Sequence, residues 1–231
     1  MEEKINNSLE GERTLSVIVP ARDEEGNIGE VIDKIRESAP RAEIIVVDNN
    51  SRDRTAQIAK EKSVLVIREE AMGKGNAARA GARAAHGRIL AFIDGDGEYD
   101  PDVLLYLAAP IRDGTYDLVY GSRFLAGSTR NGMTLPRTIG NKTLTFLASL
   151  LYQHTSDLLT GTFAIKKEKF RALNLQSKGF EIETEIFTKA VKRNFRIGEV
   201  PCAYASKKES RLNIFIDGLK ILRVLLRQKI C

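Results

Sequence analysis

Three acidic clusters in this 231-residue chain each follow directly on a short apolar run. Pro20–Glu24 follows the first run, Asp48–Ser51 closes the second, and Asp94–Glu98 closes the third. A single aspartate in such a place commonly caps a helix or forms a turn. Three acidic clusters in equivalent places instead indicate one shared ligand site.

The third cluster has the residue types of a divalent-cation site. Gly95 and Gly97 let the backbone turn tightly and leave space for a bulky ligand. Asp96 and Glu98 offer hard oxygen ligands, a set that suits Mg²⁺ or Mn²⁺ completed by substrate phosphates. Carboxylates this close repel one another and need a cation. A calcium loop is disfavoured because its repeated aspartates and distant glutamate are absent, and a solvated acidic turn stays open as the alternative.

Alternating strands and helices are expected to position these clusters. Apolar, β-branched runs predict strands at residues 15–20, 43–48, 64–67, 88–94 and 117–120, and helical spacing predicts helices at 27–38, 55–62, 76–85 and 101–112. This order predicts an α/β fold, a mostly parallel Rossmann-like sheet with helices on both faces. Ligands of such sheets bind outside the carboxyl ends of the strands, where all three clusters fall.

Composition favours one globular domain, which we expect over residues 14–205. The chain is 42% hydrophobic and 29% charged, as is typical of soluble domains. Cys202 and Cys231 give neither a disulfide framework nor zinc spacing. His86 and His154 lie far apart in the sequence, which disfavours a histidine-based metal site or catalytic triad.

The terminal segments bear on location. Residues 1–13 are polar and acidic, so we expect a disordered tail without a secretory signal. Residues 205–231 hold seven cations and two anions, which accounts for the net charge of +5. Apolar residues recur there at helical spacing, which predicts a basic amphipathic helix over residues 206–231. It would lie on an anionic membrane, dock on the domain, or do both.

Two further segments concern the approach to the site. Residues 124–137 are polar and predict a mobile loop that could close over a ligand. Residues 143–152 are apolar almost all round, which predicts either a buried core helix or a helix that dips into the bilayer. No run of 18 apolar residues predicts a transmembrane helix. We expect a cytoplasmic protein, peripheral on the cytoplasmic face of the membrane.

Nine short motifs occur in an order and spacing that resemble a known family. They are Ser16-Val-Ile-Val-Pro20-x-x-Asp23-Glu24, Val47-Asp48-Asn-Asn-Ser51, Gly73-Lys74-Gly75-Asn76, Asp94-Gly-Asp96-Gly-Glu98, Gly121-Ser122-Arg123, Asp157-Leu-Leu-Thr160-Gly161, Gly179-Phe180-x-x-Glu183-x-Glu185, Glu199-Val-Pro201 and Ser210-Arg211-Leu212. The set resembles family 2 glycosyltransferases of the GT-A fold and, within them, the polyprenyl (dolichyl) phosphate sugar synthases. The similarity covers most of the chain.

The resemblance implies an inverting, metal-dependent hexosyl transfer with Mg²⁺ or Mn²⁺ as cofactor. It implies that the nucleotide sugar contacts Pro20, Arg22, Glu24, Asp48, Lys74, Asp94, Gly95, Asp96 and Arg123. It assigns the metal to Asp96 and Glu98, catalysis to Asp96 and Arg123, and the acceptor phosphate to Arg130, Lys207, Lys208 and Arg211.

Three positions depart from the family pattern. Arg22 stands where the family often has an aromatic residue, and Glu98 stands where it often has glutamine, which adds a charge to the metal site. The late basic motif of the family usually reads Arg-x-Gly-x-Ser-Lys-Leu. Residues 206–212 lack its arginine and glycine, so several cations compete for the phosphate role.

The acceptor decides the chemistry, and two readings stay open. A polyprenyl phosphate monoester, with a second pKa of about 6, is already ionised at neutral pH and needs no general base. A hydroxyl acceptor needs a carboxylate to accept its proton, and Glu183 or Glu185 is the candidate. GDP-mannose, UDP-glucose and UDP-N-acetylglucosamine all fit as donors.

Two other classes are disfavoured. A nucleotidyltransferase should carry a glycine-rich basic loop after the first strand, where this chain has Pro20–Glu25. A nucleic-acid-binding module would explain the basic tail, but the acidic rim would repel a polyanion and no stacking motif is present. We therefore expect a nucleotide sugar, a lipid phosphate and a membrane surface as partners, and no nucleic acid.

Overall fold

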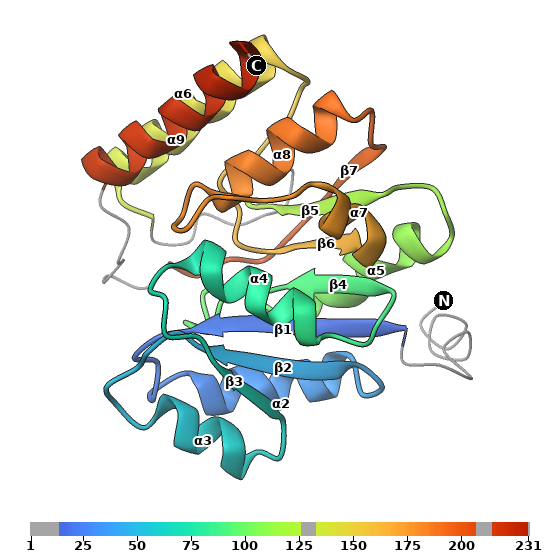
Figure 1. The fold of residues 1–231 in the computed structure, drawn as a ribbon, viewed down its shortest axis with the longest axis vertical. Coiled ribbons are helices and arrows are strands. Elements are labelled where there is room, and N and C mark those ends of the chain that lie inside the picture. Colours follow the sequence, from blue (N-terminus) through green and yellow to red (C-terminus); the bar gives the residue numbers. More distant parts are fainter. Residues whose placement is uncertain (1–13, 126–132, 207–213, 231) are drawn as a thin grey trace.

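The computed structural model describes residues 14–125, 133–206 and 214–230 (Figure 1). These residues form one seven-stranded sheet in the order β3-β2-β1-β4-β6-β5-β7. The strands are β1 Leu15–Ala21, β2 Glu43–Asp48, β3 Leu65–Arg68, β4 Ile89–Phe92, β5 Leu118–Ser122, β6 Phe163–Lys166 and β7 Ile197–Pro201. Strand β6 runs antiparallel to β4 and β5, and the other neighbouring strands pair in parallel.

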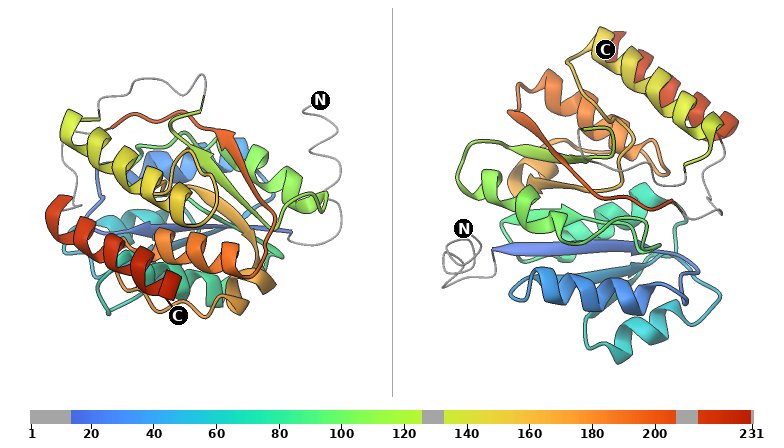
Figure 2. Two further views of the ribbon diagram at one scale, coloured as in Figure 1. Left: turned by 90° about the horizontal axis from the view of Figure 1, so that it is seen from above. Right: turned by 180° about the vertical axis from the view of Figure 1, so that it is seen from behind.

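Helices cover both faces of the sheet, which is why its central strands are apolar throughout. Helices α2 (Ile28–Ser38), α3 (Thr55–Glu61) and α5 (Val103–Arg112) lie on one face (Figure 2). Helices α4 (Lys74–Ala84), α7 (Lys167–Ala172) and α8 (Ile182–Lys192) lie on the other. The predicted α/β class, mostly parallel with helices on both faces, is confirmed.

Alternation along β1 divides the core into two parts. Val17 and Val19 pack with α2 and α5 on one face, whereas Ile18 packs with α4 on the other. Helix α4 lies very close to the sheet because it presents Gly81 there: a Cβ at this position would lie 2.4 Å from Ile18 Cγ2. A Cβ there would also lie 3.0 Å from Val47 Cγ2, so this close packing holds α4 against β1 and β2.

A helix pair forms one end of the molecule. Helices α6 (Leu135–Leu151) and α9 (Ile214–Ile230) lie side by side, and α9 also contacts α8 (Figures 1 and 2). Ile221 and Leu225 of α9 are buried, and the hydroxyl of Tyr152 donates a 2.6 Å hydrogen bond to the carbonyl of Leu225. The C-terminal helix thus docks on the domain by one face.

The predicted strands and helices match β1–β5 and α2–α5 to within a few residues, and three expectations need correction. Strands β6 and β7 were not predicted. Helix α6 begins at Leu135, inside the loop predicted over 124–137, because Thr134 is extended and Pro136 suits a first helical turn. Residues 126–132 lie outside the described residues.

The interpretation of segment 143–152 as a buried core helix is wrong, because only Thr145 and Ala148 of α6 are buried. Among the described residues, no helix is long and apolar enough to span a membrane.

Asp117, just before β5, anchors the edge of the sheet and gives a stability prediction. Its carboxylate accepts hydrogen bonds from Lys166 Nζ (2.8 Å) and from the backbone N–H of Arg196 (3.1 Å). Although burial opposes the charge, these bonds hold the pKa of Asp117 well below its usual value. We expect Asp117→Asn to lower the free energy of unfolding at pH 7 by roughly 1–3 kcal/mol, the cost of unpairing a buried group.

The pH dependence follows from the direction of that shift. Because the folded carboxyl titrates below the unfolded one, its contribution is complete above about pH 5 and is lost as the pH falls through the folded pKa. Urea unfolding should therefore show a steeper stability loss for the wild type than for Asp117→Asn between about pH 5 and about pH 3. Asp113→Asn, at a side chain that is 61% exposed, is the control and should behave as wild type. Equal slopes for all three proteins would contradict the prediction.

Candidate active site

A cavity of about 810 Å³ opens at the carboxyl ends of the parallel strands. It is bounded by the loop after β1, the turn after β4, the first residues of α4, and side chains from α6, α8 and α9. Its lining comprises Pro20, Ala21, Arg22, Asp23, Glu24, Asn27, Asn49, Gly73, Lys74, Ala77, Asp94, Gly95, Asp96, Glu98, Tyr99, Arg123, Arg137, Leu159, Gly161, Phe180, Glu183, Tyr204 and Ile221. The parallel register explains this grouping, because it brings the ends of β1 and β4 to one rim.

Most residues predicted from sequence to contact the nucleotide sugar line this cavity. The eight that do are Pro20, Arg22, Glu24, Lys74, Asp94, Gly95, Asp96 and Arg123. Asp48 is not part of the lining: it is buried, and its carboxylate accepts a 3.2 Å hydrogen bond from the backbone N–H of Ser51. The neighbouring Asn49 lines the cavity instead, and its side-chain oxygen accepts the N–H of Gly73 at 2.7 Å.

Lys74 stands at the centre of the charged part of the cavity. Its ammonium lies 2.7 Å from Asp94 Oδ1 and 2.7 Å from Glu183 Oε1. Although burial opposes its charge, these two carboxylates raise the pKa of Lys74 above its usual value. Burial raises the pKa of Glu183, with Lys74 opposing. One ammonium thus joins the first residue of α4 to the end of β4 and the first turn of α8.

Gly161 makes this ion pair sterically possible. It lies between the ring of Tyr99, whose hydroxyl oxygen accepts the N–H of Gly161 at 2.7 Å, and the Lys74–Asp94 pair. A Cβ on Gly161 would lie 2.1 Å from Asp94 Oδ2 and 3.0 Å from Lys74 Nζ. Only a residue without a side chain leaves the carboxylate and ammonium in contact.

Asp96 and Glu98 provide further carboxylate oxygen atoms from the turn after β4. Burial, and then the nearby charge of Asp94, raise the pKa of Asp96 to about 7. The Glu98 backbone N–H donates to Asp96 Oδ1 at 3.0 Å, and the hydroxyl of Tyr204 donates to Glu98 Oε2 at 2.5 Å. Within the described ranges, no three acidic, histidine or cysteine side chains gather closely enough to hold a metal ion. A cation held here needs further oxygen ligands from a substrate.

Arg123 lines the cavity as one half of a buried ion pair. Its Nε and Nη2 each lie 2.7 Å from a carboxylate oxygen of Asp157, and Nη2 also donates to the carbonyl of Leu159 at 2.8 Å. The guanidinium lies over the ring of Tyr204, 5.2 Å from its centre. Arg123 is therefore held rigidly, with much of its hydrogen-bonding capacity directed into the protein.

The two candidate bases, Glu183 and Glu185, have different surroundings. Glu183 lines the cavity, whereas Glu185 accepts hydrogen bonds from the backbone N–H groups of Gln176 and Ser177 and pairs with Lys189 at 2.7 Å. These bonds hold the pKa of Glu185 below its usual value despite its burial. Glu185 stabilises the segment before α8 and is not positioned as a base.

Four predicted residues lie outside the part of the chain that the structure describes, and several residues of the cavity were not predicted. The predicted acceptor-phosphate residues Arg130, Lys207, Lys208 and Arg211 lie outside the described residues. The cavity also contains Asn49, Tyr99, Arg137 and Tyr204, which carried no assignment. Asn49 directly follows Asp48 at a strand end, a signal that could have found it. Arg137 and Tyr204 reach the cavity only through tertiary packing.

Comparison with known proteins identifies the class. The glycosyl transferase family 2 model matches residues 16–173, and the chain belongs to this family. It is 32% identical over 214 residues to the dolichyl-phosphate hexose transferase of Haloferax volcanii, covering 90% of both chains. It is 30% identical over 210 residues to the dolichol-phosphate mannosyltransferase of Pyrococcus furiosus, covering 86% of this chain and spanning 59% of that protein.

A solved structure shows the same fold. Glucosyl-3-phosphoglycerate synthase from Mycobacterium tuberculosis, in complex with Mn²⁺, uridine diphosphate and phosphoglyceric acid, matches with a TM-score of 0.80 at 23% identity. The match covers 99% of this chain and 82% of that chain. The predicted family, GT-A fold and glycosyltransferase activity are confirmed.

Replacing Gly161 by alanine should disrupt the Lys74–Asp94 pair. The added methyl group cannot coexist with the present position of the Asp94 carboxylate, so we expect a loss of roughly 1–3 kcal/mol in the free energy of unfolding, as for other overpacked sites. Gly140→Ala is the matched control, because a Cβ there meets nothing within 4 Å and alanine favours a helix. Urea unfolding measures both, and a Gly161→Ala protein as stable as Gly140→Ala would contradict the packing argument.

Proposed function

We propose that this chain transfers a hexose from a nucleotide sugar to a polyprenyl or dolichyl phosphate at a membrane surface. The observation that carries the proposal is the position of the cavity. Its charged wall lies at the strand ends, and the cavity reaches the α6–α9 pair at Arg137 and Ile221. A lipid phosphate needs an ionic site for its head beside an apolar surface for its chain, and the exposed Phe146, Leu150 and Leu219 of that pair offer such a surface. The similarity to the dolichyl-phosphate hexose transferase, over nearly the whole of both chains, supports the same acceptor class.

The donor occupies the part of the cavity formed by the ends of β1 and β4. Pro20, Arg22 and Glu24 are the proposed contacts for the base and ribose, and Asp94 and Lys74 for the rest of the nucleotide. A carboxylate suits ribose hydroxyls, and a buried cation suits phosphate oxygens. GDP-mannose, UDP-glucose and UDP-N-acetylglucosamine all remain candidate donors.

A divalent cation, Mg²⁺ or Mn²⁺, is part of the proposal, and the residues present fit one. Asp96 and Glu98 offer hard oxygen ligands. Burial, and then the nearby charge of Asp94, raise the pKa of Asp96, and a bound cation would offset that charge. Substrate phosphates would complete the ligand shell, as is common for these ions. When bound, such a cation neutralises the negative charge that builds on a leaving diphosphate.

A phosphate acceptor suits the position of Glu183 better than a hydroxyl acceptor does. A phosphate monoester attacks the anomeric carbon as an anion, without losing a proton in the step. A hydroxyl acceptor would need Glu183 as base, and its Oε1 is already 2.7 Å from the Lys74 ammonium. One observation favours the alternative: burial raises the pKa of Glu183, as a general base requires. Transfer to a hydroxyl therefore stays the second candidate.

The α6–α9 pair supports a membrane location. Phe146, Leu150 and Leu219 are 70%, 71% and 68% exposed, which is unusual for large apolar side chains on neighbouring helices. The exposed cations of the same pair are Lys142, Lys220, Arg223, Arg227 and Lys229. Apolar and basic residues together suit the surface of an anionic bilayer. We propose that the protein is peripheral and that this pair is its membrane-facing surface.

A donor-by-acceptor matrix tests the function. The full chain is incubated with each of the three nucleotide sugars, with Mg²⁺ or Mn²⁺, and with dolichyl phosphate, undecaprenyl phosphate or hydroxyl acceptors. We expect metal-dependent transfer to a polyprenyl phosphate.

We also expect Asp96→Asn to lower the turnover at least about a hundredfold, the scale of losing a group that stabilises transition-state charge. Circular dichroism checks its fold. Transfer to hydroxyls alone would favour the second candidate, and an Asp96→Asn protein that does not fold would indicate a structural role.

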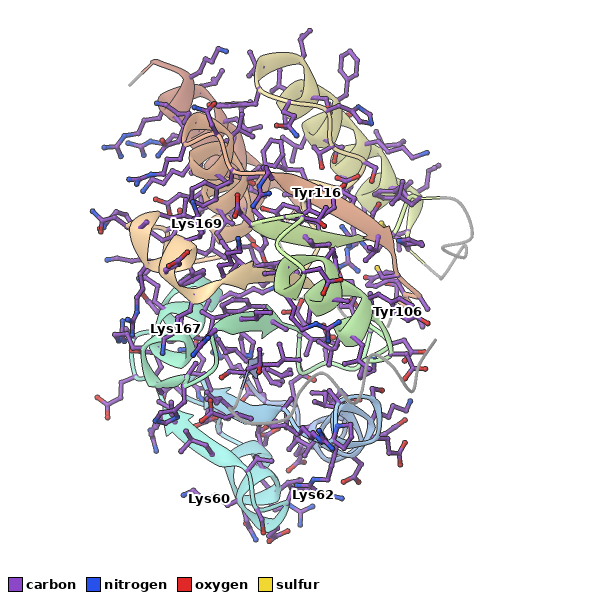
Figure 3. The ribbon with its side chains drawn as sticks, turned by 90° about the vertical axis from the view of Figure 1, so that its right-hand side faces the viewer. Lys60, Lys62, Tyr106, Tyr116, Lys167 and Lys169 are labelled. Carbon is purple, nitrogen blue, oxygen red and sulfur yellow. The ribbon has the colours of Figure 1, made fainter. Side chains whose placement is uncertain are left out.

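Membrane binding gives a separate prediction. We expect Phe146→Glu/Leu150→Glu to weaken partition to vesicles of phosphatidylserine and phosphatidylcholine more than tenfold, because each large apolar side chain contributes about 1.5–3 kcal/mol when buried. Tyr106→Glu is the control: Tyr106 is 58% exposed and belongs to α5, outside the α6–α9 pair (Figure 3). Flotation assays measure both variants. Equal partition of the two variants would contradict membrane binding through the α6–α9 pair and would leave the proposed transfer reaction unaffected.

A further inference from the structure

The segment after β7 lies across the turn that carries the proposed metal ligands. The Ala205 N–H donates to the carbonyl of Glu98 at 2.8 Å, and the Asp100 N–H donates to the carbonyl of Ala203 at 3.3 Å. Between these bonds, Tyr99 and Tyr204 form an antiparallel bridge. Two residues about a hundred positions apart in the chain thus form a single β-bridge at the cavity wall.

From this bridge, the hydroxyl of Tyr204 reaches the carboxylate of Glu98. The hydroxyl donates to Glu98 Oε2 at 2.5 Å. Tyr204 is 4% exposed. The contact is therefore formed inside the wall of the cavity, where water competes poorly for the same oxygen.

The ring of Tyr204 is held from two sides. The ring of Tyr99 lies 5.0 Å away in a tilted arrangement, and the guanidinium of Arg123 lies 5.2 Å from the ring centre. Arg123 is itself fixed by its two contacts to Asp157 at 2.7 Å. A rigid chain of contacts thus runs from Asp157 through Arg123 and Tyr204 to Glu98.

We propose that Tyr204 is a positioning residue that orients the Glu98 carboxylate toward a divalent cation. The inference rests on the proposed function, which takes Asp96 and Glu98 as the cation's protein ligands. Carboxylate ligands are commonly held by an outer hydrogen-bond donor, and loss of that donor typically weakens metal affinity about 10–100-fold. Glu98 needs such a donor because its side chain has three rotatable bonds, whereas the shorter Asp96 also accepts the Glu98 N–H.

The hydroxyl could instead serve the fold alone, and the experiment separates these roles. Mn²⁺ binding to the full chain is titrated by the electron paramagnetic resonance signal of the free ion, alone and with UDP or GDP. We expect Tyr204→Phe, which keeps the ring against Tyr99 and Arg123, to bind Mn²⁺ about 10–100-fold more weakly than wild type. Its melting temperature without metal should stay close to that of the wild type. Tyr106→Phe, the same change on an exposed ring, should leave both quantities unchanged.

A double-mutant cycle tests whether Tyr204 acts through Glu98. If it does, Tyr204→Phe should weaken Mn²⁺ binding little further in a Glu98→Ala background, which lacks the oxygen that the hydroxyl orients, because coupled residues are not additive. Additive losses would overturn the proposal. So would wild-type affinity in Tyr204→Phe, or a Tyr204→Phe protein that fails to fold. If Glu98→Ala weakens Mn²⁺ binding and Tyr204→Phe does not, this inference alone is defeated. If the wild type binds no Mn²⁺, the metal of the proposed function is defeated with it.

Discussion

The ammonium of Lys74, held between Asp94 and Glu183, is the interaction on which the rest of the cavity depends. The buried carboxylate of Glu183 and the half-buried one of Asp94 face the same space. Without a cation between them, their repulsion would push them apart or protonate one of them. The ammonium offsets part of this charge and ties three elements to one point: the start of α4, the end of β4 and the start of α8. Close packing at Gly81 and Gly161 sets the positions of these elements.

A second buried ion pair fixes the other side. Arg123 and Asp157 form a two-point contact that also supports the ring of Tyr204. The protein therefore neutralises some of the cavity's charges internally, through Lys74 and Arg123. This pairing explains how one rim can hold so many carboxylates.

The two sides of the cavity arise from different parts of the chain. The wall at the strand ends is built mainly by residues 16–98, where strand, turn and helix follow one another locally, and this region lies wholly within the matched family model. The opposite wall is formed by α6, α8, α9 and the segment around Tyr204.

The sequence by itself determined the first five strands, the helices between them and the acidic rim. Short-range periodicity specifies strands β1–β5 and the helices between them, and a parallel sheet necessarily brings its strand ends together. For the same reason, the motif residues at those ends could be placed at one site without a structure, with Asn49 in place of Asp48 as the exception.

Only the tertiary structure decided the pairings that cross the chain. Strand β6 inserts antiparallel between β4 and β5 through contacts distant in sequence, and β7 pairs in parallel with β5, also through distant contacts. Glu183 lines the cavity, whereas Glu185 accepts hydrogen bonds from the segment before α8. This difference depends on how α8 packs and is not visible in the sequence. The Tyr204–Glu98 bond joins residues 106 positions apart. No local pattern encodes such a contact, because it exists only once β7 has brought its following segment across the turn after β4.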